Sequence, residues 1–126
     1  MKYLIDTCTF IWLSTDPDKL SKTADKILQN ADNKIIVSTV SPWELALKKD
    51  DIIQTDNLEN FVKQACIRHQ LTLISPSLSH VCMVKKLPFH HKDPFDRLLI
   101  ATAIVEKIPL ISADRKIALY SIKTIW

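Results

Sequence analysis

The sequence of 126 residues contains no glycine, and this absence excludes two kinds of nucleotide site. Glycine makes up about 7% of an average protein, because it supplies the left-handed backbone that many turns require. The loops that hold phosphate in P-loop and dinucleotide-binding proteins depend on closely spaced glycines. This chain therefore has neither type of loop, and we expect its turns to be built from Asn, Asp and Pro.

Long apolar runs are also missing. No apolar stretch approaches the roughly 18 residues that cross a membrane. The first residues lead directly into a strand pattern, without the layout of a signal peptide. The sequence therefore predicts a cytoplasmic protein with no membrane partner.

Cysteine is scarce and shows no paired pattern. Cys8, Cys66 and Cys82 include no C-x-x-C pair, which argues against a disulfide framework and against a zinc site. We expect reduced cysteines within the core. The net charge of +3 permits an anionic partner without requiring one.

Apolar segments of two kinds alternate along the chain, and hydrophobic residues make up 47% of it. This content suits one domain over residues 1–126. Short, mostly apolar runs that predict buried strands lie at 2–5, 35–37, 71–74, 108–111 and 122–125. Helical patterns separate them; Ser41-Pro42-Trp43-Glu44 predicts a capping box, Asp114 to Leu119 a short helix, and Ile52-Ile53 a short extended piece. The alternation predicts an α/β fold, with a central, mostly parallel sheet of about four to five strands covered by helices on both faces.

The segment HHKDPFDRLLIA, from His90 to Ala101, begins a helix with two acids. Asp93 suits the N-cap and Pro94 the first helical position, so Asp96 falls at the third and both carboxylates project near one helix N-terminus. The apolar residues behind them predict a helix buried on most sides. Taken alone, the two acids are equally well explained by the free N–H groups and the dipole of that helix.

Four acids lie between the carboxyl end of a predicted strand and the helix that follows or in the first turn of a helix. Functional groups of parallel sheets are usually found at this edge. Asp6 follows the first strand, Glu44 lies in the first turn after the second, Asp96 heads the central helix, and Asp114 follows the fourth strand. Each acid alone could be a helix cap. Four converging carboxylates would repel one another strongly unless a cation neutralised them. Hard oxygen ligands of this kind select Mg²⁺ or Mn²⁺.

These motifs resemble those of the PIN-domain nucleases, most closely the VapC-like ribonuclease toxins of type II toxin–antitoxin pairs. The resemblance runs the whole length of the chain, through Leu4-Ile5-Asp6-Thr7, Ser41 to Lys48, His90 to Ala101 and Leu110-Ile111-Ser112-Ala113-Asp114. It implies a PIN-like three-layer α/β/α sandwich and a metal-dependent endoribonuclease with a cognate antitoxin and a homodimeric state. It also implies that Asp6, Glu44, Asp96 and Asp114 are the catalytic, metal-binding residues, with Asp93, Ser112 and Thr7 as helpers around them.

Basic residues flank the acidic motifs and are candidates to bind phosphates of a single-stranded or looped RNA, whose unstacked backbone can enter a narrow acidic groove. The predicted substrate-binding residues are Lys48, Lys92, Arg97 and Arg115, with Lys49 and Lys116 nearby. Two departures from the resemblance bear on substrate contact. Cys8 stands where relatives generally have His, and residues 49–52 lack the expected glycine.

Several alternatives remain open at this point. His90 and His91 could be metal ligands, phosphate contacts or pH-sensitive residues beside the site. Partner surfaces could include the helix with Phe10, Ile11 and Trp12 and the stripe from Leu58 to Cys66, although Phe10 and Trp12 suit the core equally well. The alternative function is a catalytically silent PIN-like module that binds RNA or protein.

Overall fold

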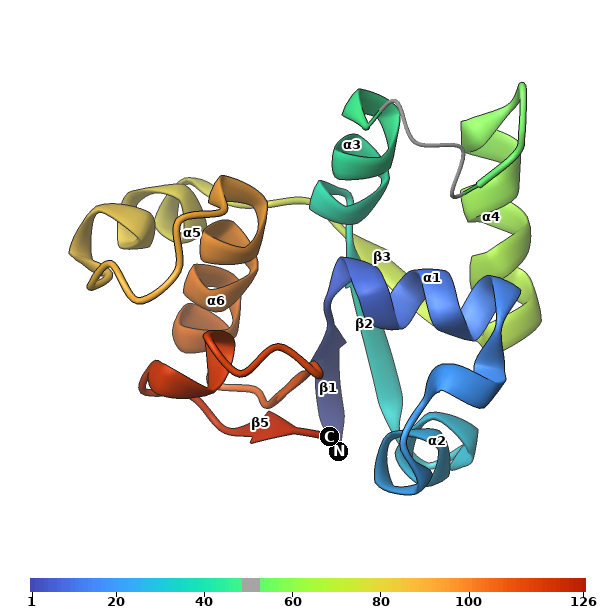
Figure 1. Cartoon of the computed structure of the whole chain (residues 1–126), viewed down its shortest axis with the longest axis horizontal. Helices are drawn as coiled ribbons and strands as arrows, with labels where there is room; N and C mark the ends of the chain where they lie inside the picture. Colours follow the sequence, from blue (N-terminus) through green and yellow to red (C-terminus); the bar gives the residue numbers. More distant parts are fainter. Residues whose placement is uncertain (49–52) are drawn as a thin grey trace.

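The computed structural model describes residues 1–48 and 53–126. Within them, five strands form one sheet in the order β3-β2-β1-β4-β5, and every pairing is parallel (Figure 1). The strands are β1 (Lys2–Ile5), β2 (Lys34–Ser38), β3 (Leu71–Ile74), β4 (Leu110–Ile111) and β5 (Thr124–Ile125). The α-helices are α1 (Thr7–Thr15), α2 (Lys22–Gln29), α3 (Val40–Leu47), α4 (Leu58–His69), α5 (Leu78–Met83) and α6 (Pro94–Glu106). The predicted α/β fold with a parallel central sheet is confirmed.

Helices cover both faces of this sheet. Figure 1 shows α1, α2 and α4 on one side of the strands and α5 and α6 on the other. Each side has its own apolar core: Ile5 and Val37 face a cluster that includes Phe10, while Leu4 and Ile36 face a cluster built on α6. Successive residues of a strand point to opposite faces, so apolar runs such as Leu4-Ile5 supply both cores. The expected three-layer arrangement is therefore present.

The strand order reverses between β1 and β4, and this places two polar residues side by side. Ile5 lies opposite Ile111 in the parallel pairing. The next residues, Asp6 and Ser112, therefore leave the sheet together at its carboxyl edge. A crevice opens at such a reversal in α/β sheets, which makes this edge the expected location of a site.

Helix starts follow the polar residues that the sequence supplies. Asp6, Ser21 and Asp93 cap α1, α2 and α6 through their side chains, as expected. The ends of two helices differ from the expectation that turns use Asn, Asp and Pro. The C-cap residues of α4 and α6 are Gln70 and Lys107, with φ of 54° and 55°. Glycine usually occupies such left-handed positions. In its absence the chain places ordinary residues there, at a cost of about 1–2 kcal/mol each.

Several element boundaries predicted from sequence are wrong. The capping box at Ser41 is absent, because α3 begins earlier, at Val40, whose N–H is bound by the Ser38 hydroxyl at 3.1 Å. Glu44 consequently lies in the second turn of α3. The predicted strands at 108–111 and 122–125 are limited to β4 and β5, and the helix expected from Asp114 is only a 3-10 turn at Ile117–Leu119. In the predicted extended piece Ile52-Ile53, Ile52 lies outside the described residues.

Burial corrects two further expectations. Cys8 and Cys82 are exposed rather than in the core, although all three cysteines are free. Phe10 and Ile11 are buried, so the core alternative for Phe10 is confirmed and the first helix does not offer them to a partner. The stripe from Leu58 to Cys66 packs mainly against the same core. In the described part of the chain, no helix is long and apolar enough to cross a membrane.

Candidate active site

A pocket of about 270 Å³ lies at the carboxyl edge of the sheet, where β1 and β4 end. All four acids predicted from sequence line it, together with two of the predicted helpers, Thr7 and Asp93. The lining residues are Asp6, Thr7, Cys8, Trp12, Glu44, Lys48, Asp93, Asp96, Ala113 and Asp114. The structure thus brings together acids that are up to 108 positions apart in the sequence, from Asp6 to Asp114.

Asp6 is a buried acid and is fixed by two donors. Its Oδ1 accepts the Thr9 N–H at 2.9 Å, as the N-cap of α1, and its Oδ2 accepts the Ser112 hydroxyl at 2.5 Å. Only 4% of the residue is exposed. Burial raises the pKa of Asp6 above its ordinary value, and the hydrogen bonds from Ser112 and Thr9 oppose that rise. The carboxylate is therefore rigid and poorly solvated.

Glu44 reaches the pocket from α3 and is only half satisfied. Its Oε2 pairs with the Lys48 ammonium at 2.6 Å, one turn along the same helix. Its Oε1 is buried and has no hydrogen-bond partner among the described residues. An unpaired buried carboxylate oxygen costs free energy unless a ligand satisfies it. This atom is the clearest sign that the pocket is built to receive a further positive group.

Asp96 carries a large electrostatic perturbation. It lies in the first turn of α6, behind the capping residue Asp93, whose Oδ1 accepts the N–H groups of Phe95 and Asp96 at 2.8 and 3.2 Å. Burial, followed by the nearby carboxylates of Asp93 and Asp6, raises the pKa of Asp96 to about 7. Neighbouring acids therefore make its ionised form costly near neutral pH.

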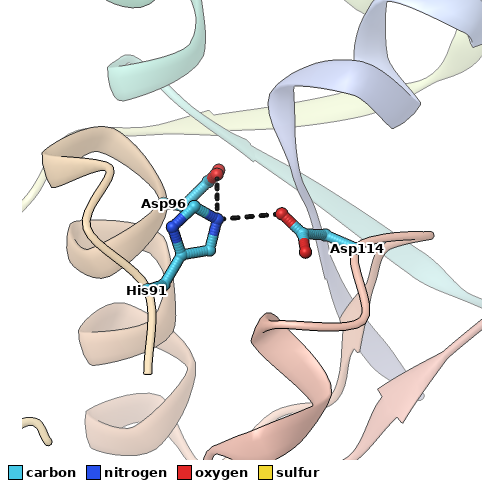
Figure 2. Close-up of side chains that lie close together, drawn as sticks. All are labelled: His91, Asp96 and Asp114. Atoms are coloured by element: carbon cyan, nitrogen blue, oxygen red, sulfur yellow. Dashed lines mark hydrogen bonds and ion pairs between the residues drawn. The ribbon is translucent and has the colours of Figure 1, made fainter. Parts of the chain in front are cut away.

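His91 joins Asp96 to Asp114. Its Nε2 lies 3.0 Å from Asp96 Oδ2 and 2.8 Å from Asp114 Oδ2, and Figure 2 shows the imidazole directed toward both carboxylates. The other oxygen of Asp114 accepts the Lys116 N–H at 2.8 Å. Partial burial acts to raise the pKa of Asp114, but the hydrogen bonds from Lys116 and His91 outweigh it, so the pKa is lowered. Asp114 thus stays ionised more readily than Asp96.

The predicted helpers contact the acids or their neighbours. The Ser112 hydroxyl donates to Asp6 and accepts the Asp114 N–H at 3.1 Å, so it links the ends of β1 and β4. Thr7 is buried and donates to the Ser41 hydroxyl at 3.1 Å, which ties α1 to α3. Both contacts fix the backbone that presents the acids.

The predicted phosphate-binding role of Arg97 is wrong. Arg97 is 6% exposed and its guanidinium points away from solvent. All its hydrogen bonds run to the loop before α6 and to Tyr120: Nη1 donates to Pro88 O, His91 O and Tyr120 Oη, and Nη2 donates to Val84 O and Leu87 O. The sequence shows a basic residue beside an acid, but these carbonyl acceptors become neighbours only in the fold. Lys92 and Arg115 are exposed, and Lys48 lines the pocket.

Sequence reasoning left the roles of two further residues open. The placement of His91 between two of the acids had one signal, its position directly before the acidic helix start. Cys8 lines the pocket, and burial, with Asp6, Asp96 and Glu44, raises the pKa of its thiol to about 11. A thiol held protonated in this way is a poor metal ligand.

The donor set fits a hard divalent cation. Carboxylate oxygens are the ligands that Mg²⁺ and Mn²⁺ prefer, and the buried unpaired oxygen of Glu44 is the observation that favours such an ion here. His91, Asp96 and Asp114 also place one potential ligand atom each within 4.8 Å of one another. The acids that would hold the ion are those predicted from sequence: Asp6, Glu44, Asp96 and Asp114.

Comparison with known proteins identifies the family of the chain. Residues 3–123 match the family model described as the PIN domain. Ribonuclease VapC22 of Mycobacterium tuberculosis is 32% identical over 116 residues, which cover 90% of this chain and 88% of the relative.

Solved structures show the same fold at low sequence identity. A chain of VapBC2 from Rickettsia felis, bound to a promoter DNA fragment, has a TM-score of 0.70 at 14% identity and covers 99% of this chain and 98% of its own. A chain of VapBC-1 from nontypeable Haemophilus influenzae has a TM-score of 0.67 at 14% identity and covers 99% and 97%. The resemblance seen in the sequence motifs is thereby confirmed, and the chain belongs to the PIN-domain family.

Proposed function

We propose that this protein is a metal-dependent endoribonuclease that hydrolyses RNA phosphodiester bonds and is the toxin of a toxin–antitoxin pair. The observation that carries the proposal is the meeting of four carboxylates in one pocket, with one buried oxygen of Glu44 left unpaired. The similarity to ribonuclease VapC22 supports the choice of RNA as substrate. The assignment of residues 1–126 to a single domain stays a prediction.

Different residues of the chain would bind the metal ion and the RNA substrate. Mg²⁺ or Mn²⁺ bound by the acids would activate water for in-line attack and offset charge on the phosphate. Asp6 and Asp114, fixed by Ser112 and by backbone N–H groups, keep ligand oxygens in place. The exposed cations of Lys92 and Arg115, with Lys48 at the pocket, would bind phosphates of single-stranded RNA, and binding should therefore weaken as salt rises.

Cleavage of single-stranded RNA by purified protein tests the proposal. The wild type should cleave in Mg²⁺ or Mn²⁺ and stop cleaving in EDTA. Asp6→Asn should retain the fold, because Asn caps a helix as well as Asp does, and should lose cleavage because it removes a ligand charge. Glu59→Gln, a first-turn acid of α4 with a side chain 80% exposed, is the matched control and should cleave normally. Full cleavage by Asp6→Asn, purified in the same way, would reject the assignment.

The alternative is a silent PIN-like module that binds RNA or protein without cutting. Thermal unfolding separates the two functions, since an ion that binds only the folded state raises the unfolding temperature by mass action. The nuclease should be stabilised by millimolar Mn²⁺, and Asp6→Asn should respond much less. RNA binding without a metal-dependent shift would favour the module.

We also propose a cognate antitoxin that acts at the pocket, and self-association as a dimer. The similar structures are VapBC proteins, which supports the antitoxin. The contact of Lys48 with Glu44 supports inhibition by a basic side chain, because the acids already accept one ammonium. An arginine from the antitoxin would pair with carboxylates in the same way. Inhibition should then weaken as Mn²⁺ rises at fixed antitoxin and ionic strength, and metal-independent inhibition would reject this displacement.

Light scattering tests the dimer directly. Large apolar side chains are exposed near α5, including Leu78 at 79% and Phe89 at 83%, which favours self-association. The purified chain should have twice the monomer mass at micromolar concentration. A stable monomer across that range would contradict the dimer and leave the nuclease proposal standing.

A further inference from the structure

The hydrogen bonds of His91 fix which of its two ring nitrogens carries a proton. Nδ1 lies 3.1 Å from the Asp93 backbone nitrogen and accepts its N–H. An acceptor nitrogen has no proton of its own, so in the neutral ring the proton must be on Nε2. Nε2 is the atom that faces Asp96 and Asp114, at 3.0 and 2.8 Å. Asp114 accepts this N–H as a hydrogen bond, and an oxygen of Asp96 lies within ion-pair distance of the same nitrogen.

This arrangement opposes a role for His91 as a metal ligand. A ring nitrogen binds an ion only through a free lone pair, and Nε2 has none while it carries the proton. Moving the proton to Nδ1 would place it against the Asp93 N–H, where two donors would face each other across 3.1 Å. His91 lies close enough to the two acids to share an ion with them. The hydrogen bond that its Nδ1 accepts, however, leaves the proton on Nε2, so His91 faces the acids as a donor.

A buried set of contacts holds His91 in this orientation. The His91 backbone N–H donates to the Tyr120 hydroxyl at 2.9 Å, and that hydroxyl donates to Pro88 O at 2.8 Å. Arg97, the residue after Asp96 in α6, donates to the carbonyls of Pro88 and His91 at 2.8 and 3.3 Å. The loop that carries the imidazole is therefore fixed to the helix that carries Asp96.

We propose that His91 is a positioning residue that holds Asp114 through the hydrogen bond from its Nε2–H and places the same polar N–H against Asp96, and that Arg97 and Tyr120 position His91 in turn. This inference rests on the proposed function, because it takes the two acids to be metal ligands. The donor fixes one oxygen of Asp114, and its positive end lies between the two carboxylates and lessens their mutual repulsion. The remaining lone pairs are thereby oriented for the ion, as outer hydrogen-bond partners do in metal sites.

Nitrogen NMR of the histidine rings tests the tautomer in the purified full chain at pH 8. His91 should show a protonated Nε2 and an unprotonated Nδ1, both without metal and with Mg²⁺. His80 is an internal reference, because its Nδ1 also accepts a backbone N–H, from Ser77, and its Nε2 faces Glu106. His91→Gln assigns the signals by loss. A proton on Nδ1 of His91, or loss of the Nε2 proton when Mg²⁺ binds, would overturn the proposal.

Calorimetric titration with Mn²⁺ tests the positioning role without any cleavage. His91→Ala should bind Mn²⁺ about 10–100-fold more weakly than wild type, the range found when outer partners of metal ligands are removed. His91→Gln can present an amide N–H at a similar reach, so it should recover most of that loss. His69→Ala is the matched control, since His69 ends α4 and does not line the pocket, and it should bind Mn²⁺ as tightly as wild type does.

The variants also separate this inference from the proposed function. Wild-type affinity in His91→Ala, or a Gln variant no tighter than the Ala variant, would overturn the positioning role while leaving the nuclease intact. A wild type that binds no Mn²⁺ would refute both the metal assignment and the positioning of metal ligands. Tyr120→Phe guards against a His91 variant that fails to fold, because it removes only the hydroxyl that holds the His91 backbone. It should weaken Mn²⁺ binding severalfold, and no change would count against the support assigned to Tyr120.

Discussion

Replacing Asp96 with Asn should make the metal-free protein more stable at alkaline pH. In the folded chain, burial and the carboxylates of Asp93 and Asp6 raise the pKa of Asp96 from 3.8 to about 7. The folded state therefore holds a proton that the unfolded state has already lost between these two values. Stability falls as pH rises through this window and then stays low. Asn keeps the shape, but it carries no charge.

The size of the gain follows from that difference in pKa. About three pKa units at 1.36 kcal/mol per unit correspond to roughly 4 kcal/mol as an upper limit. Water reaches Asp96, whose side chain is 18% exposed, and reduces this value. Loss of a negative charge in the first turn of α6 subtracts about 0.3–1 kcal/mol more. We expect a net gain of about 1–3 kcal/mol at pH 8.5, which shrinks by more than half at pH 5.

Urea unfolding in EDTA at both pH values measures this gain. The midpoint of Asp96→Asn should lie above that of wild type at pH 8.5, with an unchanged dependence on urea. Glu59→Gln is the control, because it removes another first-turn acid from an exposed position, and it should be neutral or slightly destabilising. An Asp96→Asn protein no more stable than wild type at pH 8.5 would refute the view that burial and neighbouring acids make ionised Asp96 costly in the folded chain. Saturating Mg²⁺ should reverse the order, since it stabilises only the wild type.

Three further outcomes are expected. Ser112→Ala should cost about 1–3 kcal/mol in urea unfolding and should reduce cleavage, because it removes the hydroxyl that donates to Asp6; unchanged stability would contradict this. Cys8 should react with iodoacetamide at pH 8 far more slowly than Cys82, although both residues are exposed. The reason is that a thiol pKa of about 11 lowers the thiolate fraction of Cys8 roughly 100-fold from that of a model thiol. Bound Mg²⁺ should speed the reaction of Cys8. Peptide mapping by mass spectrometry gives both rates, and equal rates would refute the role of the neighbouring acids. Tyr120→Phe should lower the free energy of unfolding by about 1–3 kcal/mol in urea, since two buried donors lose their acceptor, and a neutral effect would contradict that count.

Local signals in the sequence were sufficient for most of the fold and for the identity of the acids. A strand pattern that ends at an acid, as at Ile5-Asp6, defines both an element and its edge of the sheet. Asp93, Pro94 and Asp96 were correctly predicted as a helix start because capping depends on neighbours in the chain. The predicted start of α3 was wrong, because there a contact between residues distant in the chain replaces the local capping signal. Ser41 looks like a cap, but its hydroxyl accepts from Thr7, a contact that exists only after folding.

The roles of the residues around the acids could not be predicted, because they depend on partners distant in the chain. Arg97 lies next to Asp96 in sequence, which suggested a surface cation. Its guanidinium instead satisfies carbonyl groups of the loop before α6. An arginine that is buried and fully hydrogen-bonded to neutral acceptors still carries its charge, so it contributes to the field at the acids without contacting phosphate.

The hydrogen bonds and ion pairs of the acids orient the carboxylates and still leave the pocket favouring an ion. Asp6 is held by Ser112 and Thr9, Asp96 and Asp114 both contact His91, and Glu44 pairs with Lys48. These partners orient the carboxylates, but among the described residues only the Lys48 ammonium neutralises one directly. Burial, followed by the remaining repulsion, raises the pKa of Asp96, and the Glu44 Oε1 atom has no partner among the same residues. A divalent cation corrects both defects at once, because it supplies charge to the group of acids and a ligand bond to the unpaired oxygen. Removing any one acid should therefore stabilise the metal-free protein only where that acid is repelled, as at Asp96, and not at Asp114, whose pKa is lowered by its hydrogen bonds.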